Sequence, residues 1–364
     1  MKISIISKYW TGEHDGVGDY SAHLSEFLKQ YHSHQIQIFT STNYSDDNIN
    51  INNLQSIKEK FRLLNGLLNN HSDVIILQYV GYSFHRKGFP FWLALLTIIL
   101  SLKKKRIFTI VHETYIRPGH SFKTKIYSLL QKQCLSIILK NSTVVFTSIE
   151  RYLKQCILFQ KNSHLLRIGP NIIPQTTHLK KNDTRPYFTL WGNRDHHQAL
   201  SIFKEFNILS GGQCDLKIIG KLSDDNLNII DLFIKNAPEL AACIYVHGIV
   251  GENDLSIILS NTIGLLLIEK LEQNFGGFSL KSGISVAAIV HRTLIFSNKG
   301  DMTDGFLKHK EHLIFVPENS SMAAKLILET INNPMLIKDI KSNLVTLQQE
   351  FDWKNIANKI NEHI

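Results

Sequence analysis

The chain has 364 residues, 43% of them hydrophobic and 20% charged, which is the composition of an ordinary globular protein with room for about two domains. Its net charge of +9 favours an acidic partner: a nucleotide-bound substrate, an anionic membrane face or nucleic acid. Nucleic acid is the least favoured, because the basic residues are spread out and no aromatic-plus-basic motif lies near the one dense run, Lys103-Lys104-Lys105-Arg106.

The spacing of the four cysteines argues against a cysteine-based metal site or redox motif. They are Cys134, Cys156, Cys214 and Cys243, and their spacing matches no metal-binding or redox motif. We therefore expect buried, reduced thiols in a cytosolic protein. The first residues are strand-like and lack the architecture of a signal peptide, which agrees with a cytoplasmic location.

A glycine pair opens the first predicted helix. Gly16-Val17-Gly18-Asp19-Tyr20-Ser21 follows a strand at 2–7 and precedes a helical pattern that runs to Tyr31. Glycine lets a backbone approach a ligand, and the free N–H groups of a first helical turn suit a phosphate or carboxylate. The spacing is neither the dinucleotide fingerprint nor a P-loop. A purely structural glycine turn is the alternative.

The next part of the chain alternates between strand and helix patterns. Continuous apolar runs such as 74–79 are typical of strands buried on both faces. Alternation to about residue 168 predicts a doubly wound parallel sheet. We predict strands at 36–40, 74–79, 106–111 and 144–147, helices at 55–70, 123–140 and 149–157, and an Asn/Asp-rich loop at 43–53.

Residues 89–100 form a strongly apolar stretch, Phe89 to Leu100. A bilayer span needs about 20 apolar residues, so we predict a buried helix between two strands. The basic run that follows adds an alternative, a peripheral contact of 89–106 with an anionic membrane at the inner face of the cell membrane. The two interpretations are compatible if one face of the helix is exposed.

His112-Glu113 stands at the carboxyl end of the predicted strand 106–111. In open α/β sheets, ligands bind at that end of the strands. The pair could therefore supply a proton-handling or hydrogen-bonding group. The alternative is a polar strand end with a solvated histidine.

A proline-flanked segment, Arg167 to Pro174, separates two similar halves. Prolines favour an extended interdomain crossing here, and a polar loop at 175–186 follows. The second half repeats the design of strand, glycine loop and helix. Its predicted strands are 187–191, 216–221, 244–248, 263–268 and 294–297; its helices are 198–209, 223–236, 252–259, 284–291 and 320–332; and a polar, glycine-rich loop covers 269–283.

With both halves described, the sequence resembles the retaining glycosyltransferases of family 4. The motifs that carry the resemblance are the glycine loop at 16–21, the strand ending in a histidine at 109–113, the crossing at 170–174, the opening of the second domain at 190–194, and the terminal helix that begins at Phe351-Asp352-Trp353. Each motif alone is only modestly specific for the family. Their order and spacing along nearly the whole chain are much more specific.

The resemblance implies the fold called GT-B, with two facing Rossmann-like domains. Residues 1–170 would be the acceptor-side domain, 171–348 the nucleotide-sugar donor domain, and 349–364 a C-terminal helix that packs back toward the first domain. In this family the second domain binds the nucleotide-diphosphate sugar, and no metal or other cofactor is required.

Roles for individual residues also follow from the resemblance. Gly16, Val17 and Gly18 would contact the donor phosphates or sugar, and His112 would contact the transferred sugar near C6 or the leaving oxygen. Asp19, Tyr20 and Glu113 would lie on the acceptor side.

In the second domain, the resemblance assigns the donor diphosphate to Arg194. A lysine often follows in the family, whereas here His196-His197 stands near that place, so Lys221 or Lys281 would have to substitute.

The main departure from the family concerns its paired glutamates, which lie eight positions apart. Ser279 and Ala287 occupy those positions in this sequence. Glu272 could replace the first acid only if the loop follows a different path from that of the family. The segment Ser279-Leu280-Lys281-Ser282 resembles a variant loop, containing serine and arginine, that a subgroup of these enzymes uses instead.

The resulting expectation is hexose transfer, with retention, from a nucleotide-diphosphate sugar to a glycan or lipid-linked acceptor in the synthesis of a bacterial surface polysaccharide or glycolipid. The missing acids leave two alternatives open. One is a non-catalytic homologue that binds a sugar nucleotide or glycan, and the other is a GT-B epimerase.

Overall fold

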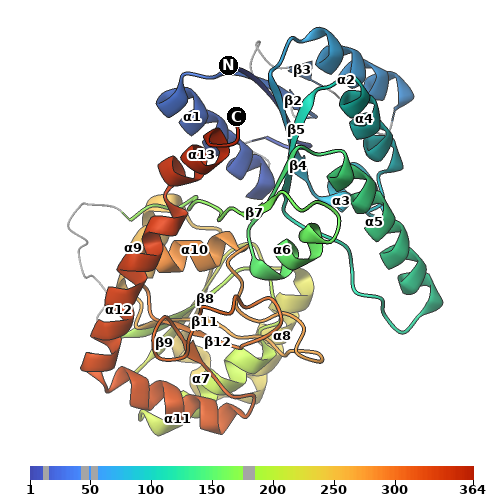
Figure 1. Ribbon diagram of the computed structural model, residues 1–364. Helices are drawn as coiled ribbons and strands as arrows, with labels where there is room; N and C mark the ends of the chain where they lie inside the picture. Colours follow the sequence, from blue (N-terminus) through green and yellow to red (C-terminus); the bar gives the residue numbers. More distant parts are fainter. Residues whose placement is uncertain (11–15, 42–48, 51–55, 175–184) are drawn as a thin grey trace. The chain divides into compact units, whose positions relative to one another are not determined.

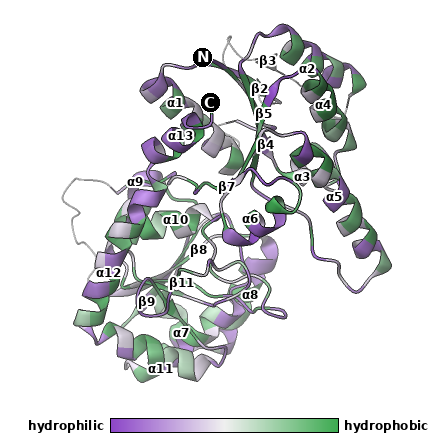
Figure 2. Cartoon of the chain, viewed as in Figure 1, coloured by the Kyte–Doolittle hydropathy of each residue, from purple (hydrophilic) through white to green (hydrophobic). Residues whose placement is uncertain are grey.

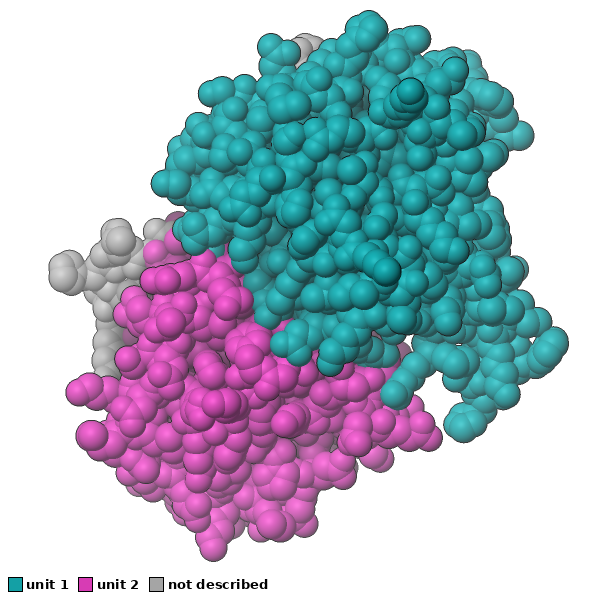
Figure 3. All heavy atoms as spheres, in the orientation of Figure 1, with its two compact units in different colours: residues 1–169, 352–364 teal, residues 170–351 magenta. Residues whose placement is uncertain are grey.

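The computed structural model describes residues 1–10, 16–41, 49–50, 56–174 and 185–364, and it divides the chain into two compact units (Figures 1 and 3). Unit 1 comprises Met1–Gly169 and Asp352–Ile364, and unit 2 comprises Pro170–Phe351. The expected domain boundaries lay after residues 170 and 348. The loops expected at 43–53 and 175–186 fall largely outside the described residues.

Unit 1 is built on a parallel sheet of seven strands in the order β3-β2-β1-β4-β5-β6-β7. The strands are β1 (Lys2–Ile6), β2 (Gln35–Thr40), β3 (Ile49–Asn50), β4 (Val74–Tyr79), β5 (Arg106–Val111), β6 (Val144–Thr147) and β7 (Ser163–Leu165). The helices are α1 (Gly16–His32), α2 (Ile57–Asn69), α3 (Gly81–Phe84), α4 (Phe91–Leu102), α5 (Phe122–Lys140), α6 (Glu150–Ile157) and α13 (Trp353–Asn361).

Strand β4 shows why this sheet carries helices on both faces. All six of its residues are buried, as its continuous apolar run predicts. Alternate side chains enter two separate clusters: Ile75 and Leu77 pack with α2, α4 and α5, whereas Val74 and Ile76 pack with α1 and α13 (Figure 1). The central strand therefore supports two hydrophobic cores.

The C-terminal helix α13 belongs to unit 1, which confirms the expected return of the chain. The Asp352 carboxylate caps it by accepting the Asn355 N–H at 3.1 Å. Its Trp353 ring lies 5.2 Å from the ring of Tyr20 on α1, between centroids. A Cβ at Gly169 would overlap the Trp353 ring, so this packing requires glycine at the end of the first chain segment.

Unit 2 repeats the plan with a six-stranded parallel sheet in the order β10-β9-β8-β11-β12-β13. The strands are β8 (Tyr187–Trp191), β9 (Asp215–Ile219), β10 (Ile244–Gly248), β11 (Gly264–Leu267), β12 (Ile295–Ser297) and β13 (Ile314–Phe315). The helices are α7 (His197–Leu209), α8 (Asp224–Asn236), α9 (Glu252–Asn261), α10 (Gly283–Val290), α11 (Ser320–Ile331) and α12 (Pro334–Gln348), with short 3₁₀ turns at Pro238–Cys243 and Gln349–Phe351.

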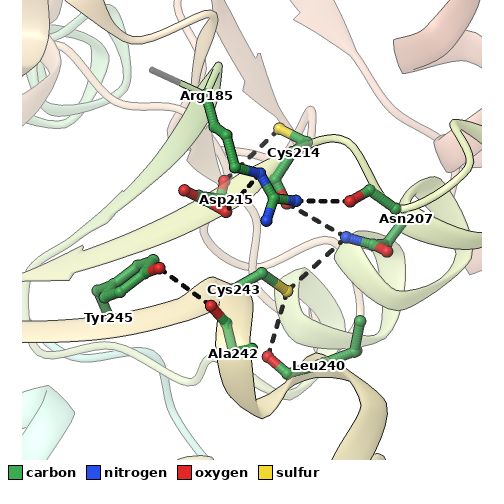
Figure 4. Close-up of polar contacts among 9 residues, drawn as sticks. Arg185, Asn207, Cys214, Asp215, Leu240, Ala242, Cys243 and Tyr245 are labelled. Atoms are coloured by element: carbon green, nitrogen blue, oxygen red, sulfur yellow. Dashed lines mark hydrogen bonds and ion pairs between the residues drawn. The ribbon is translucent and has the colours of Figure 1, made fainter. Parts of the chain in front are cut away.

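All four cysteines are buried and unbridged, as predicted. Cys214 and Cys243 lie near the start of β9 and β10, where the Asn207 amide donates to the Cys214 carbonyl at 3.2 Å and to the Cys243 sulfur at 3.8 Å (Figure 4). Burial raises the pKa of Cys214 to about 12, so this thiol stays protonated. The Arg185 guanidinium pairs with Asp215 at 3.4 Å on the same side of the sheet. These contacts join helix α7 to the starts of strands β9 and β10.

Candidate functional site

The two glycines at the start of α1 have different surroundings. A Cβ at Gly18 would lie 2.8 Å from the carbonyl oxygen of Trp10, so Gly18 allows the helix to pack against the segment that follows β1. A Cβ at Gly16 would meet no described atom within 4 Å. The accessible part of the first turn is therefore the exposed Gly16 and the half-buried Val17, whose N–H groups have no hydrogen-bond partner within the helix. Gly18 has a packing role that needs no ligand.

His112 follows β5 and is held from two sides. Its Nε2–H donates to the side-chain oxygen of Gln78 on β4 at 2.7 Å, and its ring meets that of Tyr20 edge-on, 5.1 Å between centroids. Its backbone N–H donates to Tyr79 O at 3.0 Å. Because Gln78 presents an oxygen to Nε2, Nδ1 is the nitrogen that carries the lone pair of the neutral ring. The imidazole is thus fixed in orientation at the carboxyl end of the sheet.

The three residues expected on the acceptor side, Asp19, Tyr20 and Glu113, differ in their exposure to solvent. Tyr20 is 3% exposed, and its buried hydroxyl finds no hydrogen-bond partner among the described residues. Burial raises its pKa, so the hydroxyl stays protonated. Asp19 is half-buried and Glu113 is exposed. Tyr20 therefore supports His112 from the core, and only Asp19 and Glu113 reach the surface.

In unit 2, tight glycine turns follow the first two strands. Gly192 after β8 has φ +95° and Gly220 after β9 has φ +108°, a region that favours glycine. A Cβ at Gly220 would lie 3.3 Å from the backbone nitrogen of Gly192, so the two turns are in close contact. The Asn193 side-chain oxygen accepts the Ser223 N–H at 2.9 Å and holds the start of α8 beside them. Lys221 follows Gly220 and is exposed.

Arg194 lies half-buried beside these turns. Burial lowers the pKa of its guanidinium, while the carboxylate of Glu269 acts in the opposite direction. Glu269 follows β11, and its Oε1 would be 3.2 Å from a Cβ at Gly276. Glu269 was not among the predicted site residues, although its position after a buried strand was the available signal. The two residues bring a cation and an anion to the carboxyl end of the unit 2 sheet.

The glycine-rich loop after β11 is fastened to the turn after β12. Gly276 and Gly277 have φ +103° and +82°, and a Cβ at Gly277 would overlap the backbone of Gly300. The Asp301 carboxylate accepts the Gly276 N–H at 3.0 Å. Glu272 lies in an exposed turn of this loop.

The loop ends at α10, where the remaining predicted donor contacts lie. Ser282 is the N-cap residue, its side chain makes no capping hydrogen bond, and Gly283 has open space around its Cβ position. Ser279 and Lys281 just before it are half-buried. The first-turn N–H groups of α10 therefore suit an anion.

The second expected acid position of α10 is closed to a ligand. Ala287 is 1% exposed. The neighbouring His291 donates from Nδ1 to Ala287 O at 2.7 Å and accepts from Ser256 Oγ at Nε2, 2.9 Å away. Burial lowers the pKa of His291, which keeps the ring neutral. This helix therefore offers its amino end, and not a carboxylate, to a ligand.

The two histidines after Arg194 have different surroundings. His196 is fully buried, and burial together with Arg194 lowers its pKa. His197 is exposed and lies 2.8 Å from the Asp195 carboxylate through Nδ1. In the described parts of the chain, no group of three or more His, Cys, Asp and Glu side chains could hold a metal ion.

No protein-family model and no curated protein matches the sequence. Solved structures with the same fold exist at low identity. HepE of Anabaena in complex with UDP is 13% identical, with a TM-score of 0.71 over 100% of this chain and 99% of HepE. Sucrose-phosphate synthase of Thermosynechococcus elongatus is 14% identical, with a TM-score of 0.69 over 100% and 98%. WaaG, a glycosyltransferase involved in lipopolysaccharide biosynthesis, is 9% identical, with a TM-score of 0.66 over 100% and 99%.

These likenesses agree with the two Rossmann-like units and the returning helix of this chain. The fold is GT-B, as the sequence motifs implied.

Proposed function

We propose that the protein is a glycosyltransferase that moves a hexose from a nucleotide-diphosphate sugar to a glycan or lipid-linked acceptor, with retention of anomeric configuration. The observation that carries the proposal is the half-buried Arg194 at the carboxyl end of the unit 2 sheet, beside Glu269. A guanidinium drawn out of water, next to glycine turns that expose backbone, suits a diphosphate.

The donor site would combine three sources of positive potential. Arg194 offers a fork of N–H donors, the amino end of α10 offers backbone N–H groups and its dipole, and Lys281 stands next to that end. Together they would neutralise the diphosphate leaving group without a metal ion. Glu269 would accept a hydroxyl of the nucleotide ribose or of the sugar, a role for which an acid is otherwise missing at Ala287.

His112 is the group of unit 1 that we assign to the transferred sugar. Its ring orientation is set by Gln78 and Tyr20 before any ligand arrives, so little ordering entropy remains to be lost on binding. It would hydrogen-bond the sugar near C6 or the leaving oxygen. Gly16 and Val17 offer first-turn N–H groups to the same ligand, while Asp19 and Glu113 would contact the acceptor.

HepE has been solved with UDP and with UDP-glucose, which makes UDP-glucose the first donor to test. The assay is nucleotide release from a panel of UDP-, GDP- and ADP-sugars, with and without glycan and lipid-linked acceptors. We expect release from one donor class, accelerated by acceptor. Product analysis by NMR gives the anomeric configuration, and inversion would contradict retention.

A second candidate is a non-catalytic protein that binds a sugar nucleotide. The buried Ala287 at the expected acid position favours it. Donor binding by calorimetry, without release or transfer in the presence of credible acceptors, would decide for this candidate.

A further inference from the structure

Helix α4 carries an exposed apolar stripe. Phe91, Leu95 and Leu102 are 44%, 57% and 78% exposed, and the half-buried Ile98 lies between them. Their spacing of four, three and four residues places all four on one side of the helix. The opposite side, with Leu93, Leu96 and Leu100, is buried in the core of unit 1. A soluble helix normally shows polar residues on its outer side, so this stripe needs an explanation.

Helices α2 and α5 pack against the same core as α4, on the same face of the sheet (Figure 1; coloured by hydropathy in Figure 2), and they also carry exposed apolar residues. Phe122, Ile126 and Leu129 of α5 are 78%, 37% and 55% exposed, again at spacings of four and three. Ile57 and Phe61 of α2 are 71% and 61% exposed, one turn apart. Eight exposed large apolar side chains and the half-buried Ile98 thus lie on the outer side of one helical layer, whereas scattered single residues would need no explanation.

Positive charge is concentrated around these side chains. Between residues 80 and 140 the chain has eleven Lys and Arg and one acid, Glu113, so this segment carries a net charge of +10 in a chain whose total is +9. The basic residues are thus less evenly spread than expected from the sequence, where Lys103-Lys104-Lys105-Arg106 was the one dense run. Lys103 and Lys104 at the end of α4 and Lys123, Lys125 and Lys132 of α5 are exposed. Arg106 is an exception within its run, because it donates to His363 O and Ile364 O at the C-terminal end of the chain.

A cavity of about 510 Å³ lies just before α4 and is lined by His85, Arg86, Lys87 and Phe89. The Lys87 ammonium is 5.5 Å from the centre of the Tyr127 ring on α5. Burial and the nearby lysines lower the pKa of His85, so Arg86 and Lys87 supply the charge. Cations beside aromatic rings at the rim of an apolar stripe suit the phosphate of a lipid headgroup.

We propose that the outer side of α2, α4 and α5 is a docking surface for an anionic phospholipid bilayer, with a headgroup phosphate in the cavity at His85–Phe89. Among the described residues no helix is both long and apolar enough to cross a membrane, so the contact is peripheral. The structure extends the segment 89–106 expected from the sequence to two further helices. It also argues against a second copy as occupant, because a twofold interface would bring this positive surface against itself.

The test is co-sedimentation of the full chain with vesicles of phosphatidylglycerol and phosphatidylcholine, compared with phosphatidylcholine alone. The triple variant K103Q/K104Q/K105Q should partition about 100-fold more weakly onto anionic vesicles, since each lysine near such a surface adds a factor of about five. The matched control is K325Q/K338Q/K341Q, three lysines of α11 and α12 that are exposed in unit 2. It should bind like the unaltered chain. Equal binding by both triple variants would overturn the proposal.

The apolar contribution is tested with Leu95→Ser, which should weaken binding about tenfold, against Leu209→Ser, which removes a 49% exposed leucine of unit 2. Circular dichroism melts establish that each variant is folded. Absence of binding to anionic vesicles, or a dimer in light scattering that Leu95→Ser dissociates, would refute the bilayer as occupant. The readout needs no sugar donor, so this inference can fail or hold separately from the proposed glycosyl transfer.

Discussion

The carboxyl ends of the two parallel sheets are built on the same plan of strand, glycine and helix, yet they present different chemistry. In unit 1 the central contact is the hydrogen bond of His112 to the buried Gln78, supported by the buried Tyr20. In unit 2 it is a half-buried cation, Arg194, opposite the carboxylate of Glu269.

The glycines differ in the same way. Gly18 is required by packing in a helix, whereas Gly192, Gly220, Gly276 and Gly277 have positive φ and shape turns. The difference supports the proposal that unit 2 neutralises the charge of a ligand, whereas unit 1 orients its reacting part.

The largest effect is expected at Arg194. Arg194→Ala should weaken binding of the nucleotide-sugar donor at least about 100-fold, because a charged contact in a desolvated site is lost. Calorimetry measures the dissociation constant, and Arg194→Lys is the matched variant that keeps the charge but loses the fork. Unchanged affinity of the alanine variant would remove the diphosphate from this part of unit 2.

His112→Ala should lower turnover about 100-fold and leave the donor dissociation constant nearly unchanged, since unit 1 would act on the reacting sugar and not on the charge. Steady-state kinetics and calorimetry on the same preparation separate the two quantities. Gln78→Leu should give a smaller loss in the same direction, because Gln78 only positions the ring. A fall in affinity as large as the fall in turnover would assign His112 to donor binding instead.

Gly18→Ala should destabilise unit 1 by about 2 kcal/mol, because its Cβ would overlap the Trp10 carbonyl in a packed region. Gly16→Ala should leave the free energy of unfolding unchanged, since the space around it is open. Denaturant unfolding measures both. If the backbone of Gly16 contributes to ligand binding, Gly16→Ala should lower the affinity for the donor without lowering stability. A loss of stability in Gly16→Ala, with unchanged donor affinity, would contradict this role of Gly16.

The smallest effect concerns pH and unit 2. The pKa of His291 is lowered by burial in the folded state, so below about pH 6.5 the unfolded chain binds a proton that the folded chain does not. Stability is therefore complete above that pH and is lost as the pH falls. His291→Gln should reduce the slope of the unfolding free energy against pH by up to about 1.4 kcal/mol per pH unit. The control is His247→Gln, which removes an exposed imidazole. Equal slopes in melts at several pH values would exclude His291 as a source of acid sensitivity.

Local pattern was enough to find most elements. The strand 74–79, the strand 106–111 and the helix after Gly16 are seen where their apolar periodicity predicts them. The short edge strands β7 and β13 were missed because two or three residues carry no periodicity. Helix α12 was missed although Pro334 at its start and the Asn333 cap on the Leu336 N–H at 3.0 Å were available signals.

The candidate site was only partly accessible from the sequence. His112 and Arg194 were named because they follow strands, a position that local pattern reveals. Gln78, which orients His112, lies 34 residues earlier and looked like one more residue of a buried strand. Glu269 was passed over in favour of Glu272, which the structure places in an exposed turn. Pairings between strand ends depend on sheet order, which no local window contains.

The sequence by itself determined the two cycles of strand and helix, the crossing near Gly169 and the basic character of the chain, because periodicity and charge are properties of short segments. Tertiary structure alone decided which polar groups meet and which are covered. It buried Tyr20, joined His112 to Gln78, placed Glu269 near Arg194, and set the apolar stripes of α2, α4 and α5 on one surface. Burial and neighbourhood arise when distant segments pack together, and the free energy of a buried contact depends on all of them.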